Sequence, residues 1–352
     1  MLNELITERK LPALPSLPAE RQEVLHLLAE NEYGFTPSFE GEVSGFTESH
    51  EITYGGKALS ERILLSFPTP HGTFSFRVRV LLPVEVKPAP VFLHISFHTE
   101  ENKAVNDHRI VEHVPEEEIL DHGYGIVSFC YEDVTSDSGR WDGLALAYPS
   151  GGDSGWGKIG MWAFAASRVM DYLLTREDVD STRISVSGWS RLGKTALWCA
   201  AQDERFSLAI STESGCSGAA LQRGKGGETV RDITSRFPYW FCRKYASFAG
   251  CEDKLPFDQH YLLALIAPRT VFVGSAEKDL WADPVSEFLC AKAASSAFEQ
   301  IGVPGLITPD VLPSAECDLY DGRIGYLLRR GEHWLMRRDW LAHIRFRDLH
   351  HV

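Results

Sequence analysis

The spacing of hydrophobic residues changes along the chain. In residues 20–32 they recur at helical intervals, which predicts a first helix. From about residue 40 the pattern becomes strand-like, and residues 60–83 hold two alternating runs separated by prolines and a glycine, which predicts an antiparallel hairpin. The short apolar runs at 90–97 and 125–131 indicate central strands that are covered on both faces.

The remainder of the chain alternates between strand-like and helix-like segments. The clearest helical pattern covers residues 158–177, and a last helix is predicted at 337–349. Further strand-like runs lie at 183–188, 206–212, 269–276 and 324–330. This alternation predicts an α/β fold of three layers, with a mostly parallel central sheet between helices and the antiparallel hairpin near its start.

The 352 residues are 44% hydrophobic and 24% charged, as is typical of a globular protein. No repeat or linker interrupts the pattern. We therefore expect a helical extension over residues 1–38, followed by one α/β catalytic domain over residues 39–352.

Charge and cysteine content exclude several classes of function. The net charge of −14 argues against nucleic acid or an anionic membrane as the main partner. The first residues carry charges where a signal peptide needs an apolar stretch, and no later segment is long and apolar enough to span a bilayer. We therefore expect a cytoplasmic protein, or a secreted one if the natural chain begins earlier. The seven cysteines form no CxxC pair or Cys/His cluster, which predicts buried free thiols. We expect no metal and no cofactor.

One serine lies where a strand-like run meets a helix-like run, in SVSGWSRLGK (185–194). In α/β hydrolases the nucleophilic serine occupies this kind of turn, within G-x-S-x-G. Here Gly188 precedes Ser190 by two residues, but the next glycine is Gly193, three residues later. A serine is also a common helix N-cap, so both interpretations stay open. At a nucleophile elbow, the N–H of Arg191 would be placed to bind an oxyanion.

A nucleophilic serine needs a base and an acid further along the chain. His333 follows the late strand-like run and precedes the last helix, which makes it the candidate base, whereas His260 lies in a helical pattern and is interpreted as structural. Glu213 and Asp279 each end a strand-like run after the serine. Either carboxylate could orient the imidazole, and the residue pattern leaves this choice open.

Three further side chains suit a sugar ester, and each has an ordinary alternative. Arg191 could place a guanidinium against an oxyanion or form a surface salt bridge. Lys194 lies one helical turn after the serine and could reach ligand hydroxyls or stay solvated. Trp281 could stack on a sugar ring or pack in the core. The segment 217–245 lacks periodicity and is interpreted as an irregular loop lining the site. It adds two candidates for sugar contacts, Gln222 and Glu228.

A family resemblance rests on five segments, GWSRLGK, TESGCSGAAL, LPFDQHYLLALIAPR, SAEKDLWADP and a late GEH. Together they resemble the glucuronoyl esterases, carbohydrate esterase family 15, and above all its bacterial branch. The elbow of this family reads G-x-S-R-x-G-K, so the late glycine is expected. The resemblance implies an α/β-hydrolase fold and hydrolysis of glucuronic acid or 4-O-methyl-glucuronic acid esters, by a Ser-His-acid mechanism through an acyl-enzyme.

The resemblance also implies roles for individual residues. Ser190 matches the nucleophile and His333 the base, while Glu213 matches the family acid and Asp279 a second acid of bacterial members. The matches to the oxyanion arginine, a sugar-hydroxyl contact and an aromatic wall are Arg191, Lys194 and Trp281. We favour Glu213 as the principal acid because it stands at the family distance from the serine.

The expected partner is a small-molecule or oligosaccharide uronate ester. Two other functions remain open. An acetyl-xylan esterase or another sugar deacetylase would use the same triad. A non-catalytic α/β-hydrolase-like binding protein would keep the fold without turnover.

Overall fold

The computed structural model describes residues 1–17, 19–98 and 113–350. These residues form one ten-stranded sheet in the order β1-β2-β3-β5-β4-β6-β7-β8-β10-β9. The strands are β1 (Ser44–Thr53), β2 (Ala58–Thr69), β3 (Gly72–Pro83), β4 (Ala89–Ser96), β5 (Gly125–Cys130), β6 (Val179–Trp189), β7 (Leu208–Thr212), β8 (Thr270–Ala276), β9 (Cys317–Leu319) and β10 (Ile324–Arg329).

Within the described residues, the α-helices are α1 (Leu2–Glu8), α2 (Arg21–Leu28), α5 (Glu116–Asp121), α6 (Tyr131–Val134), α7 (Leu144–Ala147), α8 (Lys158–Leu173), α9 (Arg191–Gln202), α10 (Val230–Arg236), α11 (His260–Ala264), α12 (Pro284–Gln300) and α13 (Arg337–Leu349). A π-helical turn, Ala29–Tyr33, extends α2. Short 3₁₀ turns cover Tyr54–Gly56, Arg243–Phe248 and Glu252–Lys254.

The strand directions confirm the predicted fold class. β5, β4, β6, β7, β8 and β10 run parallel, as the α/β-hydrolase fold requires. β2 and β3 form the predicted antiparallel hairpin, which closes with Thr69 opposite Gly72. Every residue of β4 and β5 is buried, as expected for central strands covered on both faces.

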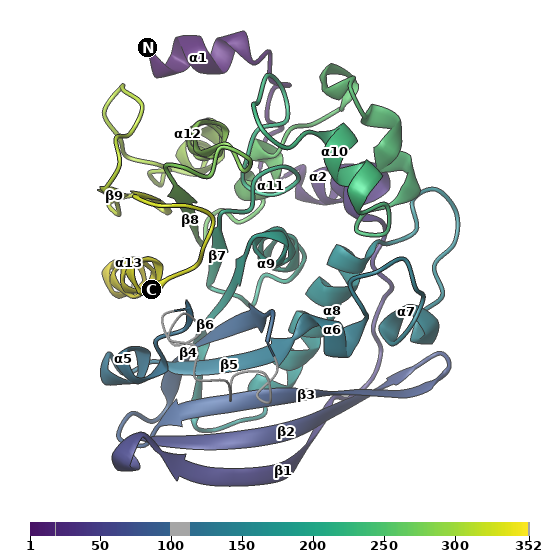
Figure 1. The fold of residues 1–352 in the computed structure, drawn as a ribbon, viewed down its shortest axis with the longest axis vertical. Coiled ribbons are helices and arrows are strands. Elements are labelled where there is room, and N and C mark those ends of the chain that lie inside the picture. The colour runs from purple at the N-terminus through teal and green to yellow at the C-terminus, as the bar shows by residue number, and fades with distance from the viewer. Residues whose placement is uncertain (18, 99–112, 351–352) are drawn as a thin grey trace.

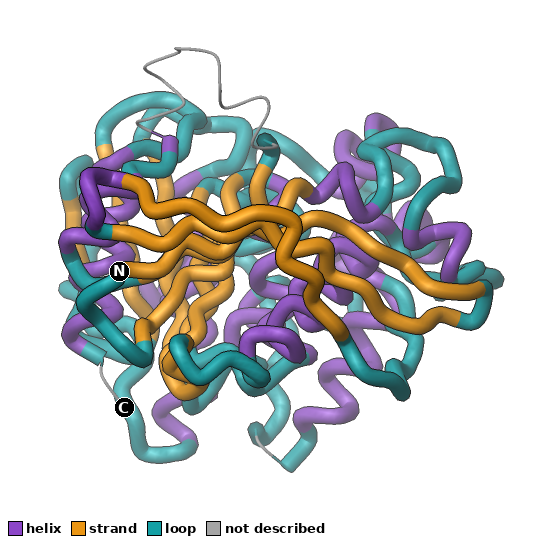
Figure 2. The backbone as a smooth tube through the Cα atoms, turned by 90° about the horizontal axis from the view of Figure 1, so that it is seen from below, coloured by secondary structure: helices purple, strands orange, loops and turns teal. Residues whose placement is uncertain are grey.

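Successive side chains of each central strand supply two separate cores. In β7, Ala209 faces the larger core, whereas Leu208 and Ile210 face the smaller one. This alternation is the two-residue period of a strand. The smaller core is covered by α5 and α13, and the larger one by α8, α9 and α12, so helices lie on both sides of the sheet (Figure 1). Seen from below, the strands form one twisted layer (Figure 2).

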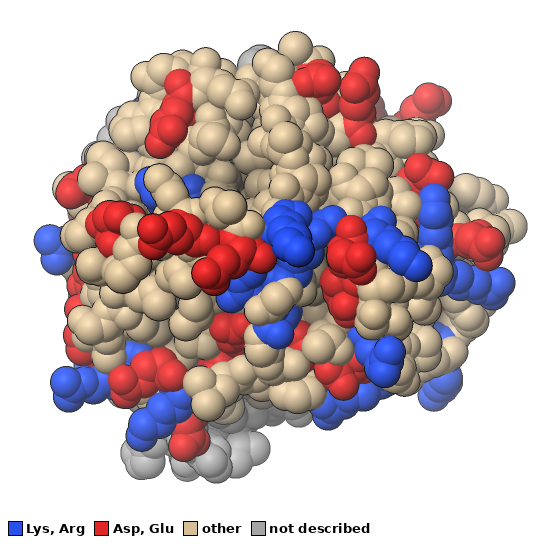
Figure 3. All heavy atoms as spheres, turned by 90° about the horizontal axis from the view of Figure 1, so that it is seen from above, with Lys and Arg blue, Asp and Glu red and all other residues tan. Residues whose placement is uncertain are grey.

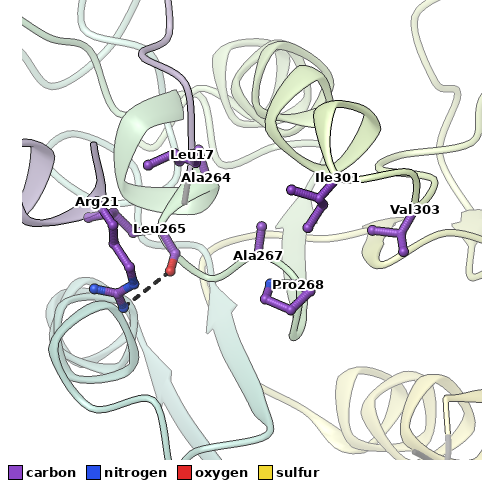
Figure 4. Close-up of a pocket in the computed structure, with 8 residues that line it drawn as sticks. All are labelled: Leu17, Arg21, Ala264, Leu265, Ala267, Pro268, Ile301 and Val303. Carbon is purple, nitrogen blue, oxygen red and sulfur yellow. Dashed lines mark hydrogen bonds between the residues drawn. The ribbon is translucent and has the colours of Figure 1, made fainter. Parts of the chain in front are cut away.

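The first 38 residues pack against the rest of the chain. Leu2, Val24 and Leu28 belong to the larger core. Arg21 reaches across to the carbonyl oxygen of Ala201, 2.6 Å away. The same segment helps to enclose an apolar cavity of about 310 Å³ beside α11 and the end of α12 (Figure 4). The division of the chain at residue 38 stays a prediction.

The interpretation of residues 217–245 as irregular is wrong for Val230–Arg236, which form α10. A reciprocal capping box starts this helix, because Thr229 accepts from the Asp232 N–H and the Asp232 carboxylate accepts from the Thr229 N–H. Only Val230 and Ile233 of the helix are buried, which is too few positions for a helical period to show. The seven cysteines are all free thiols and five of them are buried, as the sequence predicts.

The packing of α13 makes a testable prediction about pH. Burial lowers the pKa of His343 to about 3, from an ordinary value of 6.5. Below about pH 6.5, His343 therefore binds a proton in the unfolded chain but stays neutral in the folded chain. The stability that depends on neutral His343 is lost as pH falls from about 6.5 toward 3. The loss approaches about 1.4 kcal/mol per pH unit.

We expect the wild type to have a larger free energy of unfolding by urea than His343→Gln at pH 7. This difference should shrink as pH falls from 7 to 5. His71→Gln, at an exposed histidine, is the control for replacing a histidine by glutamine and is measured at the same two pH values. A wild-type advantage over His343→Gln that does not change with pH would contradict this account.

Candidate active site

Ser190 lies on a sharp turn between β6 and α9. Its backbone has φ +57° and ψ −127°, a sparsely populated region for a residue with a side chain. A Cβ at Gly188 would lie 2.0 Å from the Leu192 carbonyl oxygen, so the turn needs glycine there. The Ser190 N–H donates to the Thr212 carbonyl oxygen at 2.9 Å, which ties the turn to β7. Ser190 is thus the N-cap by position, but its side chain makes no capping hydrogen bond.

A pocket of about 300 Å³ opens beside this serine. Ser190, Glu213, Asp279 and His333 come just after β6, β7, β8 and β10, which are neighbours in the sheet. The carboxyl ends of parallel strands meet at one edge, where α/β folds bind ligands. The pocket is lined by Ser190, Arg191, Lys194, Glu213, Ser214, Gly215, Glu228, Arg236, Phe237, Trp240, Asp279, Trp281, Ala282 and His333.

The His333 imidazole lies against both candidate acids. Its Nδ1 is 2.6 Å from Asp279 Oδ2 and 3.3 Å from Glu213 Oε2. The Trp189 ring packs on the imidazole with centroids 4.9 Å apart. The Asp279 carboxylate also accepts from the Ala282 N–H at 3.2 Å, which fixes its orientation. These distances favour Asp279 over Glu213, the acid that the sequence favoured.

Glu213 is the more distant acid because its oxygens are engaged elsewhere. Trp189 Nε1 donates to one oxygen at 2.9 Å, and the Arg329 guanidinium donates to the other. The side chain is wholly buried. Burial raises the pKa of the Glu213 carboxyl well above its usual range, and contact with Arg329 opposes that rise.

Arg329, which the sequence analysis missed, holds the segment that carries the histidine. Its side chain is only 2% exposed and pairs with both Glu213 and Asp339. Its Nη2 also donates to the carbonyl oxygens of Glu332, at 3.1 Å, and Trp334. These residues flank the histidine, so one guanidinium fixes the backbone on both sides of it. The sequence feature that could have indicated Arg329 is its position, as a charged residue at the end of an apolar run.

Neither cation beside the serine is free in solvent. Lys194 is buried, and its Nζ donates to the carbonyl oxygens of Ser214 and, at 2.6 Å, Cys216. Burial lowers the pKa of the Lys194 ammonium. Arg191, the first residue of α9, forms an ion pair with Asp137. The solvated-lysine alternative is therefore wrong. The salt-bridge alternative holds in part for Arg191, because the ion pair is present but the Asp137 side chain is only 7% exposed.

The remaining predicted residues divide into two groups. Trp281 is 49% exposed, so it belongs to the pocket wall rather than to the core, and Glu228 lines the same pocket. Gln222 is buried and is not among the lining residues; its amide oxygen accepts from the Cys216 thiol. His260 lies away from the pocket, 3.2 Å from the Pro12 carbonyl oxygen.

Among the described residues, Glu213, Asp279 and His333 are also a set that could hold a metal ion, with ligand atoms within 4.8 Å of one another. A divalent cation bound there would take the His333 Nδ1 away from Asp279. The same three side chains can therefore serve either an acid–base pair or a metal, but not both at once.

Comparison with known proteins agrees with this geometry. A family model described as glucuronyl esterase, fungi, matches residues 69–302. The carbohydrate esterase MZ0003, from an unknown prokaryotic organism, is 37% identical over 94% of this chain and 84% of its own length. A 4-O-methyl-glucuronoyl methylesterase from Schizophyllum commune is 27% identical over 81% of this chain and 68% of its own length.

Solved structures agree as well. A promiscuous CE15 esterase from a marine bacterial metagenome matches with a TM-score of 0.86 and 35% identity, covering 95% of this chain and 92% of that one. A glucuronoyl esterase from Solibacter usitatus matches with a TM-score of 0.86 and 33% identity, covering 96% and 97%. The chain thus belongs to the glucuronoyl esterase family, carbohydrate esterase family 15.

Proposed function

We propose that this protein hydrolyses carboxylic esters of glucuronic acid and its 4-O-methyl form, with Ser190 as nucleophile and His333 as base. Its family membership makes it a carboxylic ester hydrolase. One observation supports the residue assignment most strongly. Ser190, whose hydroxyl makes no capping hydrogen bond, lines the same pocket as His333, whose imidazole is paired with Asp279.

The chemistry follows from the roles of these groups. With Nδ1–H donated to Asp279, the other imidazole nitrogen, Nε2, is free to take the Ser190 proton. The Ser190 Oγ attacks the ester carbonyl, and the resulting oxyanion is stabilised by the Arg191 N–H and guanidinium. The imidazolium then protonates the departing alcohol. Water, activated by the same base, releases the uronic acid from the acyl-enzyme.

The pocket wall suits a sugar that carries hydroxyls. Lys194 Nζ and Glu228 Oε2 lie 3.8 Å apart, so one hydroxyl could accept from the ammonium and donate to the carboxylate. The exposed face of Trp281 offers a flat surface for a sugar ring. We propose small-molecule or oligosaccharide uronate esters as the substrates.

The expectation of a cytoplasmic protein is contradicted by the family assignment. Glucuronoyl esterases are secreted, extracellular enzymes that act on plant cell-wall polysaccharides. The expectation came from the composition of the first residues and from the lack of a spanning segment in the sequence, which are weaker evidence than family membership.

The predictions about macromolecular partners remain untested. Within the described part of the chain, the helices are all too short or too polar to cross a bilayer. Charge is unevenly distributed, since basic side chains gather near the middle of one face with acidic ones around them (Figure 3). With a net charge of −14, we still expect no nucleic-acid or membrane partner.

Replacing Ser190 by alanine tests the proposed nucleophile. Because the hydroxyl makes no capping bond, Ser190→Ala should unfold at the wild-type temperature. Hydrolysis of benzyl glucuronate should fall by about 10⁴-fold or more, the usual cost of losing a triad nucleophile. A fluorophosphonate probe should label the wild type at Ser190 and leave the variant unlabelled. Retention of more than about a tenth of the activity would exclude Ser190 as the nucleophile.

The two acids should separate kinetically. Because Asp279 lies closer to His333 Nδ1, Asp279→Asn should lower kcat by up to about 10⁴-fold, the cost of replacing the orienting aspartate of a serine-protease triad by asparagine. Glu213→Gln should lower kcat less and stability more, since removing one partner of a buried ion pair costs about 3–5 kcal/mol.

Steady-state kinetics on benzyl glucuronate and thermal unfolding of both variants measure this difference. Each variant is the control for the other, because both replace a carboxylate by its amide within the same cluster. A larger fall in kcat for Glu213→Gln than for Asp279→Asn, with both variants folded, would return the principal role to Glu213.

A further inference from the structure

We propose that Asp137 is a positioning residue for catalysis, which fixes the Arg191 guanidinium beside the attacking Ser190. This inference rests on the proposed role of Arg191 in binding the oxyanion. Asp137 follows α6 and is 54 residues away from Arg191 in the chain. It formed no part of the motifs by which the sequence indicates the site.

Three aromatic side chains donate hydrogen bonds to Asp137 in addition to its contact with the arginine. Its Oδ1 accepts from Trp240 Nε1 at 2.7 Å, and its Oδ2 accepts from the Tyr131 hydroxyl at 3.1 Å. The Tyr239 hydroxyl donates to the Asp137 carbonyl oxygen at 3.0 Å. The Asp137 side chain is only 7% exposed. The carboxylate therefore has one fixed position, and the Arg191 Nη1 donates to it.

Electrostatics explain why the arginine needs this partner. Arg191 is the first residue of α9, where the positive end of the helix dipole disfavours a cation. The first turn of α9 contains no acidic residue. Asp137 supplies the negative charge from another segment. Without it, a guanidinium that is 26% exposed could swing toward water and take up many rotamers.

Three aromatic rings surround the Arg191 guanidinium. It lies 4.8 Å from the Trp240 ring centroid, 5.6 Å from that of Phe237 and 5.4 Å from that of Phe97. The Phe237 and Trp240 rings stack in parallel, with centroids 3.8 Å apart. Such faces attract a cation but accept no directed N–H bond of normal strength. They restrict where the guanidinium can move without accepting strong hydrogen bonds from it.

The pattern of used and unused donors supports this role. Only Nη1 is committed to Asp137, and the buried Nε has no hydrogen-bond partner among the described residues. An unpaired buried donor costs desolvation free energy, so the bare Nε calls for a structural or functional reason. The same side chain lines the pocket beside Ser190. The geometry thus holds Nη1 at Asp137, whereas Nη2 makes no hydrogen bond within the described part of the chain and is the donor left for an oxyanion.

A double-mutant cycle tests this coupling. Asp137→Asn keeps the shape of the side chain and removes its charge. We expect it to lower kcat on benzyl glucuronate at least about tenfold, within the range of coupling between contacting residues, while KM changes less than about twofold. In an Arg191→Ala background, the same Asp137→Asn change should alter kcat less than about threefold, because there is no guanidinium left to position.

Asp142 provides the matched control. Its carboxylate holds the same segment, accepting from the Thr135 hydroxyl and the Ser136 N–H at 2.9 Å each, but it forms no ion pair with Arg191. Asp142→Asn should leave kcat within about threefold of the wild type, as expected for a change outside the coupled pair. Thermal unfolding of every variant shows whether it is folded at the assay temperature.

The outcomes are distinct. If Asp137→Asn lowers kcat equally with and without Arg191, or if Asp142→Asn shows the same loss, Asp137 merely orders its segment and the inference is overturned. If Arg191→Ala lowers kcat and Asp137→Asn does not, the inference fails while the oxyanion role stands. If Arg191→Ala itself leaves kcat unchanged, that role fails and the inference falls with it.

Discussion

The geometry of the proposed active site depends on one buried guanidinium. Arg329 pairs with Glu213 and Asp339 and donates to the carbonyl oxygens on both sides of His333. A buried charge of this kind is tolerated only when its hydrogen bonds are satisfied, so the positions of all its partners are linked. The histidine segment, β10 and the start of α13 therefore hold a fixed geometry around it.

This constraint explains the unequal distances of the two acids from the imidazole. Because Arg329 and Trp189 engage both oxygens of Glu213, that carboxylate is oriented toward them, and Asp279 makes the shorter contact with the imidazole. In a comparable way, Asp137 forms an ion pair with Arg191, the residue after Ser190. The charged groups around the serine thus have fixed partners before any substrate binds. Electrostatic stabilisation of a transition state is most effective when its dipoles and charges are preorganised in this manner.

The sequence allowed prediction of those features that depend on local order. The β2–β3 hairpin and the buried β4 and β5 followed from the hydrophobic pattern. The lining residues Ser190 and His333 were found because each follows an apolar run that becomes a strand of the parallel sheet.

Other features depend on contacts between distant residues and could not be predicted. Glu213 and Arg329 are 116 residues apart, and no local pattern records their pairing. The preference for Glu213 rested on its place in the chain, whereas the distances to the imidazole depend on that pairing. Gln222 was chosen from a segment without hydrophobic periodicity. In the structure its side chain is buried and accepts a hydrogen bond from the Cys216 thiol.

The central claim is that this pocket hydrolyses a glucuronate ester. Its most direct test is to measure kcat/KM of the purified protein on benzyl glucuronate and on an acetylated xylooligosaccharide, under the same conditions. The account predicts a preference for the glucuronate ester of about 100-fold or more, the discrimination that buried polar contacts to a substrate provide. Faster deacetylation would instead make it a sugar deacetylase, and no turnover of either substrate would favour a binding protein; either result would contradict the account.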